Sequence, residues 1–183
     1  FKHITLVHNG IIENFNILKE FLIEQGYSFK TNTDSEVAAA ILNYYYEKYT
    51  DIDKTIQEFM STIIGSYAIG FIVDNDYENI YCLKKESPLI IGVSNNTNMI
   101  SSDIRAILKY TNKYYILDDF EYAKIDVSKV IIKSRTGDII SKELKEYIDE
   151  DANSSKGHYK HYMLKEIMEQ KETILKTALP FIE

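Results

Sequence analysis

Residues 4–14 read ITLVHNGIIEN, and this stretch decides how the rest of the chain is interpreted. Residues 3–8 are rich in β-branched and apolar side chains, which predicts a strand. From Ile11 onward the apolar residues recur at helical spacing. They are Ile11, Phe15, Leu18 and Leu22. We therefore expect Asn9 and Gly10 at the end of a strand, just before an amphipathic helix.

A second telling stretch, residues 33–37, reads TDSEV. Thr33 and Glu36 have the spacing of a capping box, so a helix should begin here with Asp34 in its first turn. One interpretation of Asp34 is structural, because an acid in a first turn is stabilised by the helix dipole. The other interpretation is that its carboxylate binds a cationic group such as an ammonium.

The Asn9–Gly10 pair also allows two interpretations. Asn-Gly is typical of tight hairpin turns, but a hairpin should be followed by a second strand, and here a helical period follows. The chemical interpretation is that the Asn9 amide and the neighbouring N–H converge on a developing oxyanion. Each such donor can lower a barrier by about 3 kcal/mol. Glycine allows close approach of a ligand. His8, beside Asn9 at the end of the strand, is expected to be a structural hydrogen-bond partner.

The remaining pattern places helices early and late, with strands between them. Strands are expected at 66–73, 79–84, 89–93, 99–101, 113–117, 122–125 and 130–132, and a last one after the turn at 135–138. Short helices are expected after Asp51 or Asp53 and at 103–110, and a longer one at 159–177. Hairpin-length connections indicate antiparallel pairing, so the predicted class is α+β.

Composition limits the possible functions. The chain has 183 residues with 45% hydrophobic content, enough for one sizeable core. A net charge of −7 argues against broad nucleic-acid binding. Cys82 is the single cysteine, which excludes an internal disulfide and fits a reducing compartment. No stretch is long and apolar enough to predict a membrane span, so a cytoplasmic location is expected. Neither nucleotide-binding motifs nor metal-ligand clusters are found, so no cofactor or metal is expected.

Several stretches together resemble a known family. Residues 7–14 and 33–37 are similar to the glutaminase domain of the class II, N-terminal-nucleophile amidotransferases. Three further stretches look like the same domain: 65–68, 87–92 and 101–103. Residues 156–170 read KGHYKHYMLKEIMEQ, which resembles the segment joining the glutaminase and sugar-isomerase halves in one branch, the glucosamine-6-phosphate synthases.

The resemblance implies a four-layer αββα sandwich of antiparallel sheets. It implies that Asn9 and Gly10 form the oxyanion hole and that Asp34 holds the α-amino group of glutamine, with His8 also in the substrate site. In that branch, ammonia released from glutamine is delivered to fructose 6-phosphate bound by the isomerase domain. The products are glucosamine 6-phosphate and glutamate, and a homodimer is expected.

The sequence departs from the family pattern in its nucleophile. The family uses an N-terminal cysteine whose own α-amine acts as base. This chain begins with Phe1 in what is predicted to be a strand in mid-course, so we expect residues 1–150 to be an N-terminally truncated glutaminase domain. Residues 151–183 would be a linker and a helix leading to an isomerase domain. Cys82 is internal, so the chain by itself is expected to be inactive.

Three alternatives remain open. The chain could belong to another class II enzyme, such as an amidophosphoribosyltransferase. It could be a non-catalytic module that binds glutamine or a partner. It could also be a structural α+β module in which Asn9–Gly10 is a turn and Asp34 is a helix cap.

Overall fold

The computed structural model describes residues 1–95, 97–148 and 157–179. It divides into two compact units, Phe1–Tyr147 and Ile148–Glu183. All the described strands and the first three helices belong to the first unit. Of the predicted linker and helix at 151–183, residues 151–156 and 180–183 lie outside the described residues.

The helices of the first unit precede most of its strands. They are α1 (Phe15–Glu24), α2 (Asp34–Tyr49), α3 (Ile52–Thr62) and the short 3₁₀ helix η1 (Ile104–Ala106). The strands are β1 (Ile4–Ile12), β2 (Gly65–Val73), β3 (Asp76–Lys85), β4 (Ile90–Val93), β5 (Asn98–Ser101), β6 (Lys113–Ile116), β7 (Tyr122–Ile125), β8 (Val130–Lys133), β9 (Ile139–Ile140) and β10 (Lys145–Glu146).

The strands form two antiparallel sheets, which confirms the predicted α+β class. One sheet has six strands in the order β1-β2-β3-β7-β8-β9, and the other has four in the order β10-β6-β4-β5. Strand β10 was not predicted, because its Lys-Glu sequence carries no apolar signal. It pairs with β6, and Asn112 Nδ2 donates to Glu146 Oε1 at 2.9 Å beside this pairing.

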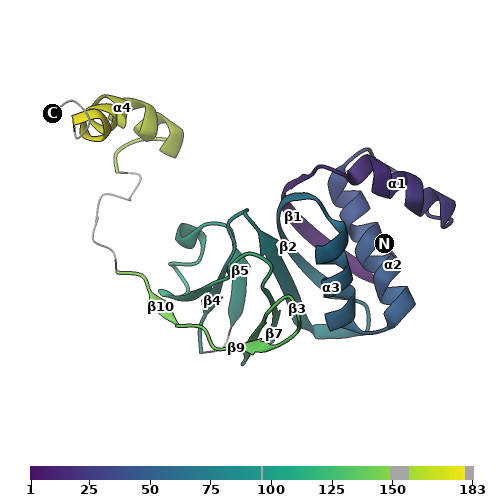
Figure 1. Ribbon diagram of the computed structural model, residues 1–183. Coiled ribbons are helices and arrows are strands. Elements are labelled where there is room, and N and C mark those ends of the chain that lie inside the picture. Colours follow the sequence, from purple (N-terminus) through teal and green to yellow (C-terminus); the bar gives the residue numbers. More distant parts are fainter. Residues whose placement is uncertain (96, 149–156, 180–183) are drawn as a thin grey trace. The chain divides into compact units, whose positions relative to one another are not determined.

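Two apolar cores account for the layering. Helices α1, α2 and α3 cover one face of the six-stranded sheet (Figure 1) and share a core with its inner residues, including Leu22, Ile41 and Phe59. The second core lies between the sheets, around Cys82, Ile91 and Ala123. Strand β2 is buried on both faces, which explains its almost unbroken apolar sequence.

The outer face of the four-stranded sheet differs from the expected fourth layer. A side chain at Gly92 would meet Ile107 and Thr111, so the segment after η1 covers this face. The predicted helix at 103–110 is a single 3₁₀ turn followed by turns. Within the described part of the first unit, the layers are therefore helices, sheet, sheet and this short cover. A full fourth layer stays a prediction.

The boundary between β1 and α1 corrects the sequence analysis. Strand β1 continues through Asn9 and Gly10 to Ile12, and α1 begins at Phe15. Ile11, expected on the buried stripe of the helix, lies in the strand with 65% of its surface exposed. The helical spacing between Ile11 and Phe15 is therefore a coincidence, because Ile11 lies in β1 and Phe15 begins α1.

The predicted helix ends are largely confirmed. The Thr33 side chain accepts a hydrogen bond from Glu36 N, which caps α2. The Glu36 carboxylate turns instead to the backbone N–H groups of Lys30 and Thr31, so the box is only half formed. Asp51 caps α3, and Gly26, with φ of +89°, follows the end of α1.

The second unit contains α4 (Tyr162–Ala178), three residues shorter at its start than predicted. Within this unit one side of the helix is apolar and exposed, with Met163, Ile167 and Ile174. None of the described helices is long and apolar enough to cross a membrane.

Asn14 joins three elements, and this generates a first prediction. Its Nδ2 donates to Thr62 O at 2.9 Å and its Oδ1 accepts from Ile64 N at 3.0 Å, which fixes the start of α1 to the α3–β2 connection. We expect Asn14→Ala to lower the free energy of unfolding by about 2 kcal/mol, about 1 kcal/mol for each bond. Urea denaturation measures this.

Asn16→Ala, at an exposed position of α1, is the matched control and should change stability by less than about 0.5 kcal/mol. Equal effects of the two substitutions would show that the Asn14 bonds do not hold the helix in place.

Candidate functional site

The Asn9–Gly10 pair lies inside a regular strand pair rather than in a turn. Asn9 faces Ala68 and Gly10 faces Tyr67 along the β1–β2 ladder. Gly10 has φ of +134°, and a Cβ there would lie 2.1 Å from Ser66 O. Only glycine fits both the torsion angle and the space. The hairpin interpretation is therefore wrong for this pair.

The free edge of β1 carries the N–H of Gly10. Strand β1 is the end strand of its sheet and pairs with β2 alone among the described strands. Glu13 N donates toward the β2 side, to Ile64 O, whereas Ile12 N donates away from β2, to Asp34 Oδ2 at 2.9 Å. Because N–H directions alternate along an antiparallel strand, Gly10 N–H points to the same free edge as Ile12 N–H.

Asp34 is held against this edge from the first turn of α2. Its Oδ2 accepts the Ile12 N–H, while Thr33 caps the helix. The side chain is 24% exposed, so a ligand can still reach this carboxylate. Asp34 is therefore not simply a helix cap, because its carboxylate accepts a hydrogen bond from strand β1 and not from its own helix.

His8 approaches the same carboxylate from β1. Its Nδ1 lies 3.0 Å from Ser35 Oγ and 3.9 Å from Asp34 Oδ1, and its side chain is only 2% exposed. Burial lowers the pKa of His8 from its ordinary value, and the nearby Asp34 charge opposes that shift only in part. His8 is therefore neutral at pH 7.

Asn9 occupies the opposite face of the strand from His8, because successive side chains alternate. There it lines a depression of about 150 Å³ between the two sheets. The lining residues are Val7, His8, Asn9, Ala68, Gly70, Leu89, Ile100, Ser101 and Ser102. Asp34 does not line this depression. Asn9 and Asp34 thus flank the Gly10 edge from two sides and do not share one enclosed cavity among the described residues.

Two further contributors were not singled out from the sequence. Ser35, adjacent to Asp34, links that carboxylate to His8, with its Oγ 3.5 Å from Asp34 Oδ1. Asn14, the last residue of the HNGIIEN stretch, anchors the chain as it leaves β1. Both residues belong to the two motifs quoted from the sequence, and this was the one sign of their importance. Ser35 contacts a residue 27 positions away and Asn14 one 48 positions away, and local sequence patterns do not reveal such contacts.

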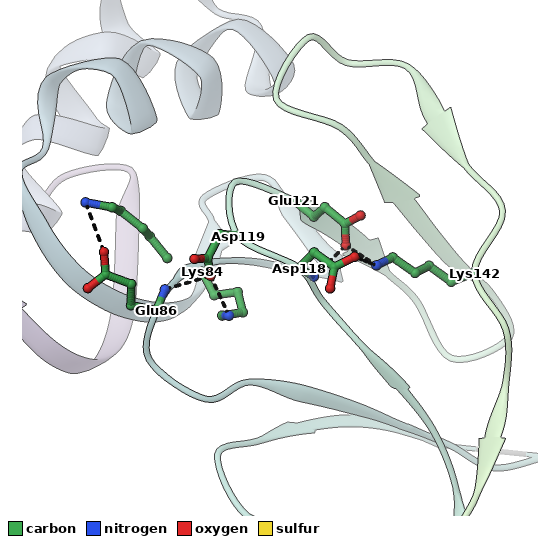
Figure 2. Close-up of polar contacts among 7 residues, drawn as sticks. Lys84, Glu86, Asp118, Asp119, Glu121 and Lys142 are labelled. Carbon is green, nitrogen blue, oxygen red and sulfur yellow. Dashed lines mark hydrogen bonds and ion pairs between the residues drawn. The ribbon is translucent and has the colours of Figure 1, made fainter.

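A second polar cluster lies near the turn between β6 and β7. Figure 2 shows the members of this β6–β7 charge cluster, which are Lys84, Glu86, Asp118, Asp119, Glu121 and Lys142. Asp119 Oδ1 accepts from Lys84 Nζ at 2.6 Å and from Glu86 N at 2.7 Å. The Lys84 hydrogen bond holds the pKa of Asp119 below its ordinary value.

On the other side of the cluster, Lys142 pairs with both Asp118 and Glu121. The opposite charges of the cluster thus satisfy one another. Lys84 is in register with Ala68, and Ala68 with Asn9. The cluster therefore lies on the same row of paired strand residues as Asn9. The carboxylates of Asp118, Asp119 and Glu121 are already paired with lysines.

Cys82 is not suited to be a nucleophile. It is 0% exposed in the core between the sheets. Burial raises the pKa of its thiol to about 12, so almost no thiolate forms at pH 7.

Comparison with known proteins bears on this geometry. The sequence model of one family, described as a glutamine amidotransferase domain, matches residues 1–109. A glutamine–fructose-6-phosphate aminotransferase (isomerizing) of Caldanaerobacter subterraneus subsp. tengcongensis is 45% identical over 95% of this chain. Its namesake from Clostridium acetobutylicum is 41% identical, also over 95% of this chain. The chain spans 28% of the length of each of these relatives.

Among solved structures, the glutamine phosphoribosylpyrophosphate amidotransferase of B. subtilis, complexed with ADP and GMP, has the same fold. It matches with a TM-score of 0.63 and 22% sequence identity, covering 74% of this chain and 30% of that one. This similarity agrees with the predicted α+β arrangement of two antiparallel sheets and helices, whereas the four-layer sandwich stays a prediction.

The close approach at Gly10 generates a second prediction. We expect Gly10→Ala to destabilise the first unit by more than about 3 kcal/mol, because the methyl group would overlap Ser66 O and the torsion angle is unfavourable. Thermal unfolding of the variant measures this.

Gly26→Ala is the matched control, since Gly26 also has a positive φ but has nothing within 4 Å of its Cβ position. It should cost only about 1 kcal/mol. A Gly10 variant no less stable than the Gly26 variant would contradict the close approach.

Proposed function

Because this chain belongs to the family of class II glutamine amidotransferase domains, we propose that its first unit binds L-glutamine at the free edge of β1. Asp34 holds the α-ammonium group. The N–H of Gly10 and the side chain of Asn9 receive the amide oxygen of glutamine as it gains negative charge. The hydrogen bond from Ile12 N to Asp34 Oδ2 carries this proposal, because it brings the carboxylate to the strand edge where Gly10 N–H points.

The spacing of these groups suits an amino acid with a side-chain amide. Positions two residues apart on a strand are about 6.6 Å apart. An extended glutamine side chain can bridge Asp34, at the Ile12 end, and the Gly10 N–H. The neutral state of His8 leaves the Asp34 charge available for the ligand's ammonium.

For the longer protein, the same proposal extends to transfer of the released ammonia to fructose 6-phosphate. Two relatives that are 45% and 41% identical carry that activity in their names, and this favours the synthase branch over the phosphoribosylpyrophosphate enzyme, which is 22% identical and supports the fold alone. Residues 151–183 would lead to a sugar-isomerase domain, and the full protein would be a homodimer.

By the resemblance to the family, hydrolysis would use a cysteine thiol as the nucleophile. Cys82 is the single cysteine of the sequence and is buried. The residues of this chain therefore supply binding groups and oxyanion donors, and the attacking thiol has to come from elsewhere in the active enzyme.

Binding of L-glutamine, measured by isothermal titration calorimetry at pH 7.5, tests the proposed site. We expect Asp34→Asn to weaken binding about 10- to 100-fold, the loss that follows from removing one charge-assisted contact of about 1.5–3 kcal/mol. The asparagine Oδ1 can still accept the Ile12 N–H, so the fold should be retained.

Glu20→Gln, on the exposed side of α1, is the charge-matched control and should bind as the unaltered chain does. Glutamine binding that is equally strong in the Asp34 variant would rule out this carboxylate as the ammonium site.

A separate prediction concerns turnover. We expect no detectable ammonia release from glutamine by this chain, and no change in a sensitive ammonia assay on Cys82→Ala. Hydrolysis that disappears in Cys82→Ala would contradict the assignment of this thiol to the core.

A further inference from the structure

His8 is a buried titratable group that the proposed binding mode does not use. One ring nitrogen, Nδ1, contacts Ser35 Oγ at 3.0 Å. The other, Nε2, is buried and has no hydrogen-bond partner among the described residues. A buried polar atom without a partner is costly, so its retention calls for an explanation.

The contacts of His8 form a chain that ends at Asp34. When His8 is neutral with its proton on Nδ1, this N–H donates to Ser35 Oγ. The Ser35 hydroxyl is then free to donate to Asp34 Oδ1, 3.5 Å away, while Ile12 N–H holds Oδ2. In this arrangement both carboxylate oxygens of Asp34 accept a hydrogen bond. The three donors, His8 Nδ1–H, the Ser35 hydroxyl and Ile12 N–H, each have an acceptor.

We propose that His8 is a positioning residue for Asp34: neutral His8 orients the carboxylate through Ser35, and protonated His8 competes with the ligand's ammonium for it. This inference rests on the proposed function, since it names the regulation of the same site by pH. The ligand class is a primary ammonium carried by an amino acid, with L-glutamine as the probe.

The distances make the competition direct. Protonation at Nε2 would place a full positive charge on a ring whose Nδ1 is 3.9 Å from Asp34 Oδ1. The groups facing His8 from α2 are Asp34 and Ser35, and β2 places the apolar Ile69 opposite it. Asp34 is the charged group that acts on His8 within the described residues. Among the described residues, burial is the cause that opposes protonation of His8.

The direction of the pH effect follows from these contacts. Burial lowers the pKa of His8 from its ordinary value, so the imidazole is neutral at pH 7 and becomes charged on acidification. Linkage is reciprocal: if protonation of His8 weakens ammonium binding, bound ammonium must lower the pKa of His8 by the same free energy.

The test uses the full chain with L-glutamine as the probe and two readouts. Calorimetry at pH 7.5 and pH 5.0 should show binding that weakens on the order of tenfold at the lower pH. In His8→Asn, whose amide takes the place of Nδ1 beside Ser35 but cannot be protonated, this acid weakening should disappear. His3→Asn, at a histidine near the start of the same strand, should keep it.

The second readout is an NMR titration of the His8 ring, which needs no ligand. Asp34→Asn should lower the pKa of His8 further, because the opposing charge is removed. An unchanged pKa of His8 in Asp34→Asn, or an acid weakening of equal size in His8→Asn, would overturn the proposal. Failure to bind glutamine at any pH would instead overturn the proposed function, and the pKa comparison would still decide whether His8 and Asp34 are coupled.

Discussion

The hydrogen bond between Ile12 N and Asp34 Oδ2 is the contact on which the site depends. It joins the free edge of a sheet to the first turn of the helix packed beside it. An unpaired edge N–H would otherwise be left to solvent or to another strand. By accepting it, Asp34 becomes fixed one strand repeat from the outward N–H of Gly10, so a carboxylate and an outward N–H share one edge.

Glycine at position 10 serves both the fold and the proposed chemistry. Its positive φ and its contact with Ser66 O allow β1 and β2 to approach where a side chain would separate them. The same absence of a side chain leaves the outward N–H accessible to a ligand. Substitution here cannot separate the two roles, whereas Asp34 and His8 can be altered without removing this close approach.

Much of this arrangement could be predicted from the sequence, and the failures have physical causes. The α+β class, most strands and the Thr33 cap followed from period and turn residues. The end of β1 was misplaced because Ile11 fits a helical spacing while lying in a strand. The contact of Asp34 with Ile12, the link through Ser35 and the anchoring by Asn14 join distant segments, and no local pattern encodes them.

A crystal structure of the chain with bound L-glutamine tests the central claim most directly. The account predicts the α-ammonium group within hydrogen-bond distance of an Asp34 oxygen and the side-chain carbonyl oxygen facing Gly10 N–H and Asn9. Glutamine bound with its ammonium away from Asp34, or only in a depression that excludes the Gly10 edge, would contradict it.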